Sequence, residues 1–270
     1  DLGPAVSAAF LADLPHAVAA ELRFDQRPVA VPLNVHRLNV LWSNLRLLRA
    51  QGLAVPRDWD EFHATAAALQ QRGVLPLAMG SSAGQKLSVF VGVVLGRAGR
   101  DFFERALVQA DPRLLQSAQM RGLLSEFRQL KRYTDAGQVS RDWAGATALL
   151  LQGKAAFQLT GDWANGEFLK AGWQAGQDYD CTPAPGHTNL HYFEFDRLIF
   201  FASRDPAQAE QQRRLAALLL QPAVSSRLAQ LKGGIPVRRD AALEGFNACA
   251  RRSAADFRAG DARGQLVLAL

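Results

Sequence analysis

A chain of 270 residues is long enough to fold as one large domain or as two lobes around a sizeable hydrophobic core. Its composition, 49% hydrophobic and 21% charged, is typical of globular proteins, and no apolar run approaches the roughly 18 residues of a membrane-spanning helix. The net charge of +6 comes mainly from scattered arginines without a basic run, which argues against a nucleic-acid-binding protein.

The first segment of the chain predicts a helix followed by a strand. Its opening residues carry acidic side chains and no basic segment, which argues against an uncleaved signal peptide. Residues 1–24 show the periodicity of a helix, with Pro15 or Pro4 as the position where it is interrupted. Residues 27–44 alternate apolar and polar side chains, so we expect a strand with Asn34 and His36 on its polar face.

The next segment shows start and stop signals of a helix. Asp58 is expected to be the N-cap, with Glu61 three residues later completing a capping box, and Gly73 ends the helix. A short apolar strand over residues 74–80 and a glycine/serine loop over residues 80–85 follow. A further helix is predicted over residues 112–132.

The stretch of residues 141–173 holds three of the five tryptophans. Its helical pattern leads into an apolar strand that breaks at Gly161-Asp162-Trp163 and starts a second helix. Beyond it, the chain predicts a strand, two helices, a glycine turn and a helical tail, at residues 190–202, 206–220, 222–231, 232–236 and 241–257. Strands separated by helices indicate an α/β fold.

The sequence shows no motif of a nucleotide or metal site. His-Glu-x-x-His and glycine-rich phosphate loops are missing. His187 and His191 are four residues apart but follow a Pro-Gly turn, so helical ligand spacing does not apply to them. The paired carboxylates of a glycosidase form only in three dimensions, so the sequence leaves that class open. We expect no catalytic residue, no metal and no cofactor.

The remaining candidates form a binding constellation. Trp143 and Trp163 offer flat faces to a sugar or a cation, although tryptophans are more often core residues. Asp196 lies inside an aromatic strand and needs a partner, either a ligand or a cation such as Arg197. Lys232 either binds the ligand or caps the helix that it ends.

Several motifs together carry a resemblance to a known family. In chain order they are VPLNVHRLNVLWSN, VPRDWDEFHATAAAL, GVLPLAMG, DWAGATALLLQGKAAFQLTGDWANGEF, DYDCTPAPG, FEFD, LKGGIPVR and GFNACARRSAADF. They span most of residues 29–257. The chain resembles the glucose/mannose-type substrate-binding proteins of bacterial ABC sugar importers, within the family-1 extracellular solute-binding proteins.

The resemblance implies a type II periplasmic-binding-protein fold, an α/β fold with two lobes and a ligand cleft. The N-terminal lobe is expected to be incomplete, because family members begin with further βαβ units. By the resemblance, residues 1–36 and 190–235 form the N-terminal lobe. Residues 37–185 and 236–270 form the C-terminal lobe.

The resemblance also implies a site and a disulfide. Its substrate-binding residues, matched position by position, are Trp143, Trp163, Asp196, Lys232, Gln85 and His36. Two cysteines are too few for a disulfide scaffold, and composition leaves open one bridge or two buried thiols. The family pattern implies that Cys181 and Cys249 form a disulfide.

The function implied is that of an exported, monomeric, non-enzymatic protein that delivers a monosaccharide, with glucose first among the candidates, to the permease subunits of an ABC transporter. The sequence departs from the family at Gly186-His187 and at Arg197, which follows Asp196 where a serine is usual. The alternatives are a degenerate scaffold that serves as a sugar sensor or interaction domain, and a glycoside hydrolase.

Overall fold

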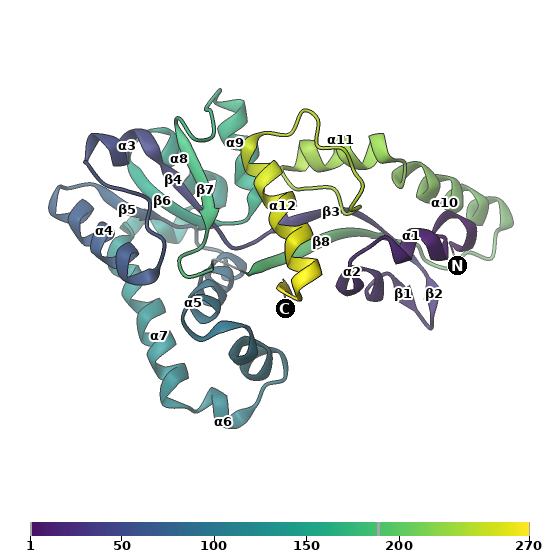
Figure 1. The fold of residues 1–270 in the computed structure, drawn as a ribbon, viewed down its shortest axis with the longest axis horizontal. Helices are drawn as coiled ribbons and strands as arrows, with labels where there is room; N and C mark the ends of the chain where they lie inside the picture. Colours follow the sequence, from purple (N-terminus) through teal and green to yellow (C-terminus); the bar gives the residue numbers. More distant parts are fainter. Residues whose placement is uncertain (1, 188–189, 270) are drawn as a thin grey trace. The chain divides into compact units, whose positions relative to one another are not determined.

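The computed structural model of the protein describes residues 2–187 and 190–269, drawn in Figure 1. The chain divides into two compact units, Asp1–Arg37 with Phe193–Ala269 (the first unit) and Leu38–Tyr192 (the second unit). The first unit therefore contains residues 236–269, which the predicted lobe division assigns to the same lobe as residues 37–185.

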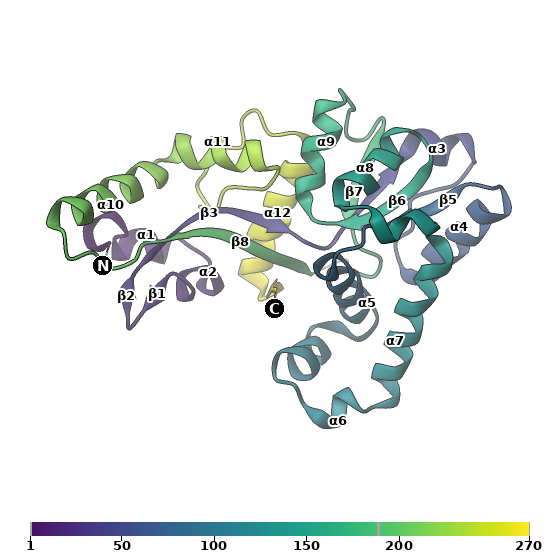
Figure 2. The same cartoon turned by 180° about the vertical axis from the view of Figure 1, so that it is seen from behind.

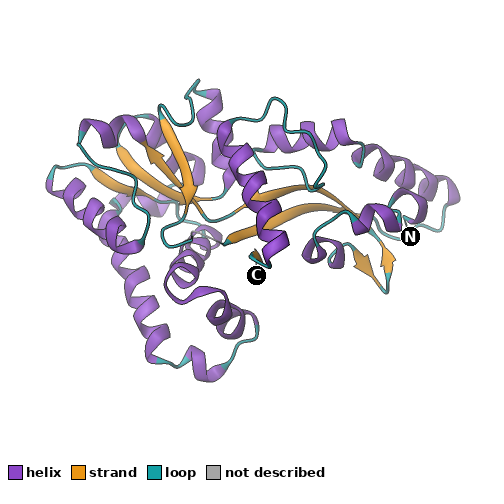
Figure 3. Ribbon diagram, in the orientation of Figure 1, coloured by secondary structure: helices purple, strands orange, loops and turns teal. Residues whose placement is uncertain are grey.

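The first unit combines short N-terminal helices with a small sheet and three longer helices. Among its described residues the sheet has the order β3-β8-β9, in which β3 and β8 run antiparallel (Figure 3). Its elements are η1 (Gly3–Ala5), α1 (Ala8–Ala12), α2 (His16–Ala20), β1 (Arg23–Phe24), β2 (Arg27–Pro28), β3 (Ala30–Arg37), β8 (His191–Ile199, whose first two residues belong to the second unit), α10 (Pro206–Leu219), α11 (Pro222–Lys232), α12 (Ala248–Arg263) and β9 (Leu266–Leu268).

The helical stretch predicted over residues 1–24 is divided into η1, α1 and α2. Pro15 is the N-cap of α2, so the helical stretch is broken there, as expected for a residue without a backbone N–H. The segment then ends in the β1–β2 hairpin, where Phe24 pairs with Arg27. Asp25 and Gln26 adopt left-handed conformations at its tip, with φ of 48° and 61°.

Strand β3 is buried on both faces. Its apolar side chains, including Val31 and Val35, pack into a core with Phe193 and Phe257. Its polar side chains Asn34 and His36 lie on the opposite face and are also buried. The antiparallel register places Asn34 opposite Asp196, and a bulge interrupts the pairing between Pro32 and Asn34.

The second unit is a four-stranded sheet covered by helices, seen from the other side in Figure 2. The strand order is β5-β6-β4-β7; β5 and β6 are parallel, and β4 is antiparallel to β6 and β7. Its elements are β4 (Val40–Asn44), α3 (Leu45–Ala50), α4 (Trp59–Gln71), β5 (Leu75–Ala78), α5 (Ala83–Phe103), η2 (Glu104–Val108), α6 (Pro112–Leu115), α7 (Ala118–Leu130), η3 (Lys131–Tyr133), η4 (Ala136–Ser140), α8 (Trp143–Leu151), β6 (Ala155–Thr160), η5 (Asp162–Ala164), α9 (Asn165–Lys170) and β7 (Tyr179–Pro183).

The predicted start and stop of α4 are confirmed. The Asp58 carboxylate accepts a hydrogen bond from the Glu61 backbone N–H at 2.8 Å. The Glu61 side chain does not close the capping box; it accepts a hydrogen bond from the Arg57 backbone N–H at 2.9 Å instead. Gly73 follows the helix with φ of 72°, a conformation that favours glycine.

Other predicted elements are present with different bounds. The strand predicted over residues 27–44 is three strands, β2, β3 and β4, which belong to three different sheets. The helix predicted over residues 112–132 is divided by Ser117, which caps α7. The helical tail begins after Asn247 and extends to Arg263. None of the described helices is both long and apolar enough to cross a bilayer.

Both cysteines of the chain, Cys181 on β7 and Cys249 on α12, are disulfide-bonded. The disulfide implied by the resemblance is therefore present. A disulfide persists in oxidising compartments and is rare in the cytosol.

Thiol titration tests this bond. The denatured, unreduced protein should contain no free thiol, and the same protein after reduction should contain both. Replacing both cysteines with serine should lower the free energy of unfolding by about 2–4 kcal/mol, because the unfolded chain loses a constraint. Two titratable thiols before reduction would contradict the bond.

Candidate functional site

Three of the predicted binding residues come together in the first unit. The His36 Nε2 atom lies 3.3 Å from Asp196 Oδ2. Lys232 donates a hydrogen bond from Nζ to the same carboxylate oxygen. The side chains of Asp196 and Lys232 are 35% and 46% exposed and can reach a ligand, whereas the side chain of His36 is 5% exposed and lies behind them. We call these three residues, with Asn34, the Asp196 cluster.

The Lys-Gly-Gly-Ile-Pro turn positions the lysine of this cluster. Lys232 is the last residue of α11, and Gly233 ends the helix in the left-handed conformation, with φ of 82°. Ile235 and Val35 then exchange two backbone hydrogen bonds of 2.9 Å, which fix the turn against β3. A Cβ atom at Gly234 would lie 2.5 Å from the Val35 carbonyl oxygen, so glycine is required for this close approach.

The Asp196 carboxylate is ionised at neutral pH. Burial alone raises the pKa of Asp196, but the hydrogen bond from Lys232 and the charges of His36 and Lys232 outweigh it, so the pKa lies below the ordinary value. An ionised carboxylate is an acceptor with several lone-pair directions, so Asp196 can accept a hydrogen bond from a ligand hydroxyl while it is bound to Lys232.

The two predicted stacking tryptophans meet in the second unit. Trp143 begins α8, and Trp163 lies in η5 directly after β6. Their ring centroids are 6.3 Å apart and their planes are inclined by 68°. Both side chains are only partly buried, whereas Trp42 and Trp59 are core residues with 1% exposure. The tryptophan pair therefore keeps apolar ring surface accessible.

The entry into α8 is fixed by polar contacts. Asp142 caps the helix by accepting a hydrogen bond from the Gly145 backbone N–H at 2.7 Å. The side-chain amide of Gln158, on the adjacent strand β6, donates to the Trp143 carbonyl oxygen at 2.9 Å. The Thr147 hydroxyl donates to the same amide at 2.8 Å. These contacts fix the position of Trp143 relative to strand β6.

Gly161 provides the space beneath Trp163. A Cβ atom at Gly161 would overlap the six-membered ring of the Trp163 indole, so any side chain there would displace the ring. The Gly161 carbonyl oxygen accepts a hydrogen bond from Trp42 Nε1 at 3.3 Å, which ties this backbone to the core. The Gly-Asp-Trp motif thus sets the orientation of the indole.

Gln85 lies in the first turn of α5, which Ser82 caps by accepting a hydrogen bond from the Gln85 backbone N–H at 3.2 Å. Its side chain is 8% exposed, and neither polar atom of its amide has a hydrogen-bond partner among the residues that the structure describes. A Cβ atom at Gly80 would overlap Gln85 Oε1 and lie 2.9 Å from the Asp142 carbonyl carbon, so this amide adjoins the segment that enters α8. Burying such an amide costs free energy unless a ligand or a water molecule forms hydrogen bonds with it.

His187, weighed above as a metal ligand, has a structural role. Its Nδ1 atom lies 2.8 Å from Asn39 Nδ2, and its Nε2 atom lies 2.7 Å from the Gly92 carbonyl oxygen. Both ring nitrogens therefore have protein partners, as expected for a buried histidine that fixes a loop.

Sequence reasoning did not assign Asn34 to the site. Its side chain is fully buried, and its Nδ2 atom lies 2.7 Å from His36 Nε2. The available signal was its position two residues before His36 in a strand, which places both side chains on one face.

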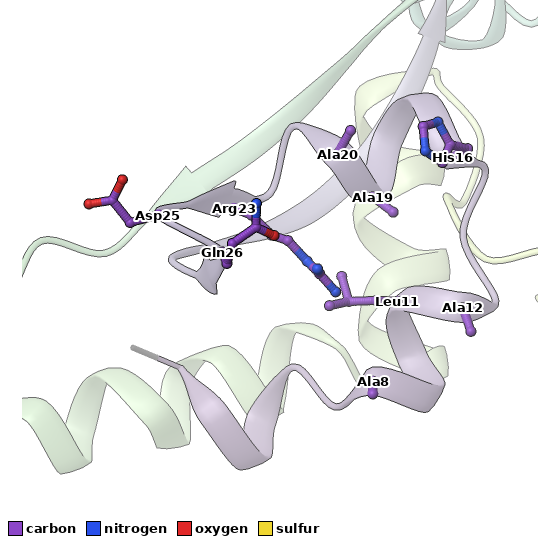
Figure 4. Close-up of a pocket in the computed structure, with 9 residues that line it drawn as sticks. All are labelled: Ala8, Leu11, Ala12, His16, Ala19, Ala20, Arg23, Asp25 and Gln26. Atoms are coloured by element: carbon purple, nitrogen blue, oxygen red, sulfur yellow. The ribbon is translucent and has the colours of Figure 1, made fainter.

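A pocket of about 620 Å³ lies elsewhere in the first unit, between α1, α2 and the β1–β2 hairpin. Figure 4 shows that Arg23 reaches toward Leu11 while Asp25 points away. None of the predicted binding residues lines this pocket, whose lining includes several alanines.

Known proteins resemble this chain in sequence over most of its length. The profile of the bacterial extracellular solute-binding proteins matches residues 1–191. A probable sugar-binding periplasmic protein of Brucella suis is 35% identical over 248 residues, which cover 91% of this chain and 58% of that protein. A glucose-binding protein of Saccharolobus solfataricus is 29% identical over 154 residues, 55% of this chain and 27% of that protein. The chain thus spans less than two thirds of the length of either relative.

A solved structure described as a chitin oligosaccharide binding protein superposes with a TM-score of 0.78 at 18% identity, and covers 99% of this chain and 68% of that one. This likeness shows a shared fold and confirms the predicted fold class.

The close approach of Gly234 can be tested by stability measurements. Replacing Gly234 with alanine should lower the free energy of unfolding by about 1–3 kcal/mol, because the new methyl group displaces the turn from β3. Gly122→Ala is the matched control: Gly122 is exposed inside α7 with open space around it, so alanine there should stabilise the protein by up to about 1 kcal/mol. Equal effects of the two variants in chemical denaturation would contradict the assignment.

The lowered pKa of Asp196 predicts the pH dependence of its contribution. Because the folded-state pKa lies below the unfolded-state value, the stabilisation by this ion pair is complete above about pH 4 and is lost as the pH falls through the folded-state pKa. The difference in melting temperature between wild type and Asp196→Asn should therefore be constant from pH 7 to 5 and shrink in more acidic solution. A difference in melting temperature that grows as the pH falls would contradict this prediction.

Proposed function

Because the chain belongs to the bacterial extracellular solute-binding protein family, we propose that it binds a monosaccharide, with glucose as the first candidate, and delivers it to the permease of an ABC importer. The observation that supports this most is the Asp196 cluster: an ionised carboxylate, partly exposed, held by Lys232 on a turn fixed against β3. The family is one of solute-binding proteins, so the proposed role is binding without turnover.

The chemistry of the candidate residues suits a sugar. A pyranose carries hydroxyl groups around its rim and apolar C–H surface on its faces. Asp196 and Lys232 supply an acceptor and a donor for hydroxyl groups, and Gln85 supplies both in one amide. Trp143 and Trp163 supply ring surface for the C–H face.

The choice of glucose rests on the motif resemblance and not on the fold. The solved structure with the same fold is described as binding chitin oligosaccharide, and a relative of partial coverage is named a glucose-binding protein. The motifs around Asp196 and Lys232 are those of the glucose/mannose-type proteins, which favours a monosaccharide.

An exported location is part of the proposal. The disulfide of Cys181 and Cys249 is expected to persist outside the cytosol, and the Brucella relative is named a periplasmic protein. Such a location would bring the protein to the outer face of a permease.

Calorimetric titration with glucose tests the proposal. Wild type should release or absorb heat on binding, and Trp163→Ala should weaken binding by about 1–3 kcal/mol because the sugar loses a stacking face. Trp173→Ala is the matched control, since Trp173 is also partly buried but packs against Phe168 and under the Arg46 guanidinium. That variant should lose stability without a change in affinity.

Equal loss of affinity in both tryptophan variants would contradict a specific stacking role for Trp163. Absence of binding to glucose, galactose and mannose in the folded wild type would contradict the proposed function. Turnover of aryl glycosides would instead favour a glycoside hydrolase.

A further inference from the structure

A pocket of about 550 Å³ at the C-terminal end of α7 contains none of the candidate binding residues. Its lining is polar and basic, and consists of Ser125, Arg128, Gln129, Lys131 and Arg132. The three cationic side chains, Arg128, Lys131 and Arg132, are exposed. We call these three residues the basic patch.

The positive charges of the basic patch are not compensated by nearby carboxylates. The two acidic residues that flank the patch in sequence are already bound: Glu126 lies 2.9 Å from Arg97, and Asp135 lies 2.7 Å from Arg141. Among the residues that the structure describes, no member of the patch forms an ion pair. The patch is therefore able to bind an external anion.

The segment around α7 carries an excess of positive charge. Residues 112–134 contain five basic side chains and one acidic side chain, Glu126, which gives a net charge of +4, compared with +6 for the entire chain. Because Glu126 binds Arg97 of α5, it does not offset the charge on the solvent side of α7. This side of the helix is strongly positive.

Helix α7 turns one side toward the core of the second unit and the other toward solvent. Leu123 is buried, and Phe127 packs edge-on against Phe90 of α5 with 5.5 Å between the ring centroids. Arg121 and Arg128 lie two turns apart and are both exposed. The basic side chains thus extend along the helix and beyond its end.

The backbone that carries the basic patch is held by other groups. The side-chain amide of Gln70, on α4, donates a hydrogen bond to the Arg132 carbonyl oxygen. The backbone N–H and the hydroxyl of Thr134 donate to the Lys131 carbonyl oxygen at 3.3 and 2.9 Å. These carbonyl oxygens at the end of the helix have partners without the cationic side chains.

The helix dipole does not explain the whole distribution of charge. Cations near the C-terminal end of a helix interact favourably with the dipole, but the effect falls off within one turn and has the opposite sign at the N-terminal end. Arg121 lies near the start of α7, four residues after the N-cap Ser117. Its guanidinium donates to the Gln116 carbonyl oxygen at 2.7 Å and keeps further donors for a ligand.

A layer of phosphate groups suits this surface better than a protein partner does. A protein interface gains much of its affinity from apolar anchors that fill pockets, and no residue that lines this pocket is apolar. The attraction of lysine and arginine to anionic lipid headgroups needs no packed pocket and adds up over neighbouring side chains. A guanidinium group can also bind a phosphate through two parallel hydrogen bonds.

We propose that the basic patch, together with Arg121, binds the phosphate groups of an anionic phospholipid surface, so that the solvent side of α7 faces a membrane. This inference goes beyond the proposed function, because binding to lipid requires no sugar. The contact is electrostatic between exposed groups, so it depends strongly on the salt concentration.

Sedimentation with lipid vesicles tests the proposal in the absence of sugar. The protein should sediment with vesicles of phosphatidylglycerol and phosphatidylcholine at low salt, and not with vesicles of phosphatidylcholine alone. High salt should release it, because mobile ions screen exposed charges. The patch variant, which combines Arg128→Gln, Lys131→Gln and Arg132→Gln, should bind the anionic vesicles about tenfold more weakly or worse.

A matched variant separates a local surface from the effect of net charge. It removes three exposed positive charges from the first unit and changes the net charge equally, by Arg204→Gln, Arg227→Gln and Arg263→Gln. This control variant should bind the anionic vesicles as the wild type does. Equal losses in the two variants, both folded by circular dichroism, would contradict a local binding surface. Absence of binding by the wild type at low salt would overturn the proposal.

Two soluble anions distinguish the source of the negative charge. Inorganic phosphate should displace the protein from the vesicles no better than sodium chloride of equal ionic strength. Displacement by phosphate at a much lower ionic strength would identify a site for the free anion and overturn the membrane assignment. Binding to polyglutamate that is lost in the patch variant, without binding to anionic vesicles, would assign the patch to an acidic protein instead.

Glucose titration keeps this inference separate from the proposed function. The patch variant should bind glucose as the wild type does, because none of the candidate binding residues is changed. A loss of glucose affinity in the folded patch variant would contradict the separation of the two surfaces. If the wild type binds no sugar, the proposed function fails, while the vesicle experiment still decides the role of the basic patch.

Discussion

The close approach of Gly234 to β3 is the constraint on which the Asp196 cluster depends. The two backbone hydrogen bonds between Val35 and Ile235 form only because no side chain separates the turn from the strand. Through this contact the end of α11 is fixed relative to β8, and the Lys232 ammonium group reaches the Asp196 carboxylate. A lone carboxylate in an aromatic strand, unfavourable by itself, becomes a partly exposed ion pair.

The second unit uses a glycine in the same way. Gly161 leaves room for the indole of Trp163 to lie over the backbone, and the contact of Trp42 with the Gly161 carbonyl oxygen fixes that backbone to the core. In each unit the candidate binding side chain lies next to a closely packed glycine of the backbone. Rigid placement lowers the entropy lost on binding, which would favour the proposed binding of a small polar ligand in competition with water.

Much of this could be predicted from the sequence because it depends on local signals. The cap at Asp58, the glycine turn after Lys232 and the break at Gly161-Asp162-Trp163 are local, and each is where it was expected. The site residues themselves were named by resemblance, and the structure brings His36, Asp196 and Lys232 together in one unit.

The features that the sequence did not predict depend on pairing between distant segments. The alternation of apolar and polar residues over 27–44 correctly indicates an extended chain. It does not show that the chain leaves one sheet after Arg37 and enters another. The β1–β2 hairpin was missed because Asp25 and Gln26 form its tip without a glycine. The position of Asn34 opposite Asp196 depends on the pairing of β3 with β8, which the sequence does not show.

A crystal structure of the protein soaked with glucose tests the central claim most directly. The account predicts electron density for a sugar with a hydroxyl group bound to Asp196. A sugar bound only in the alanine-rich pocket between α1, α2 and the β1–β2 hairpin, with the Asp196 cluster free of ligand, would contradict it.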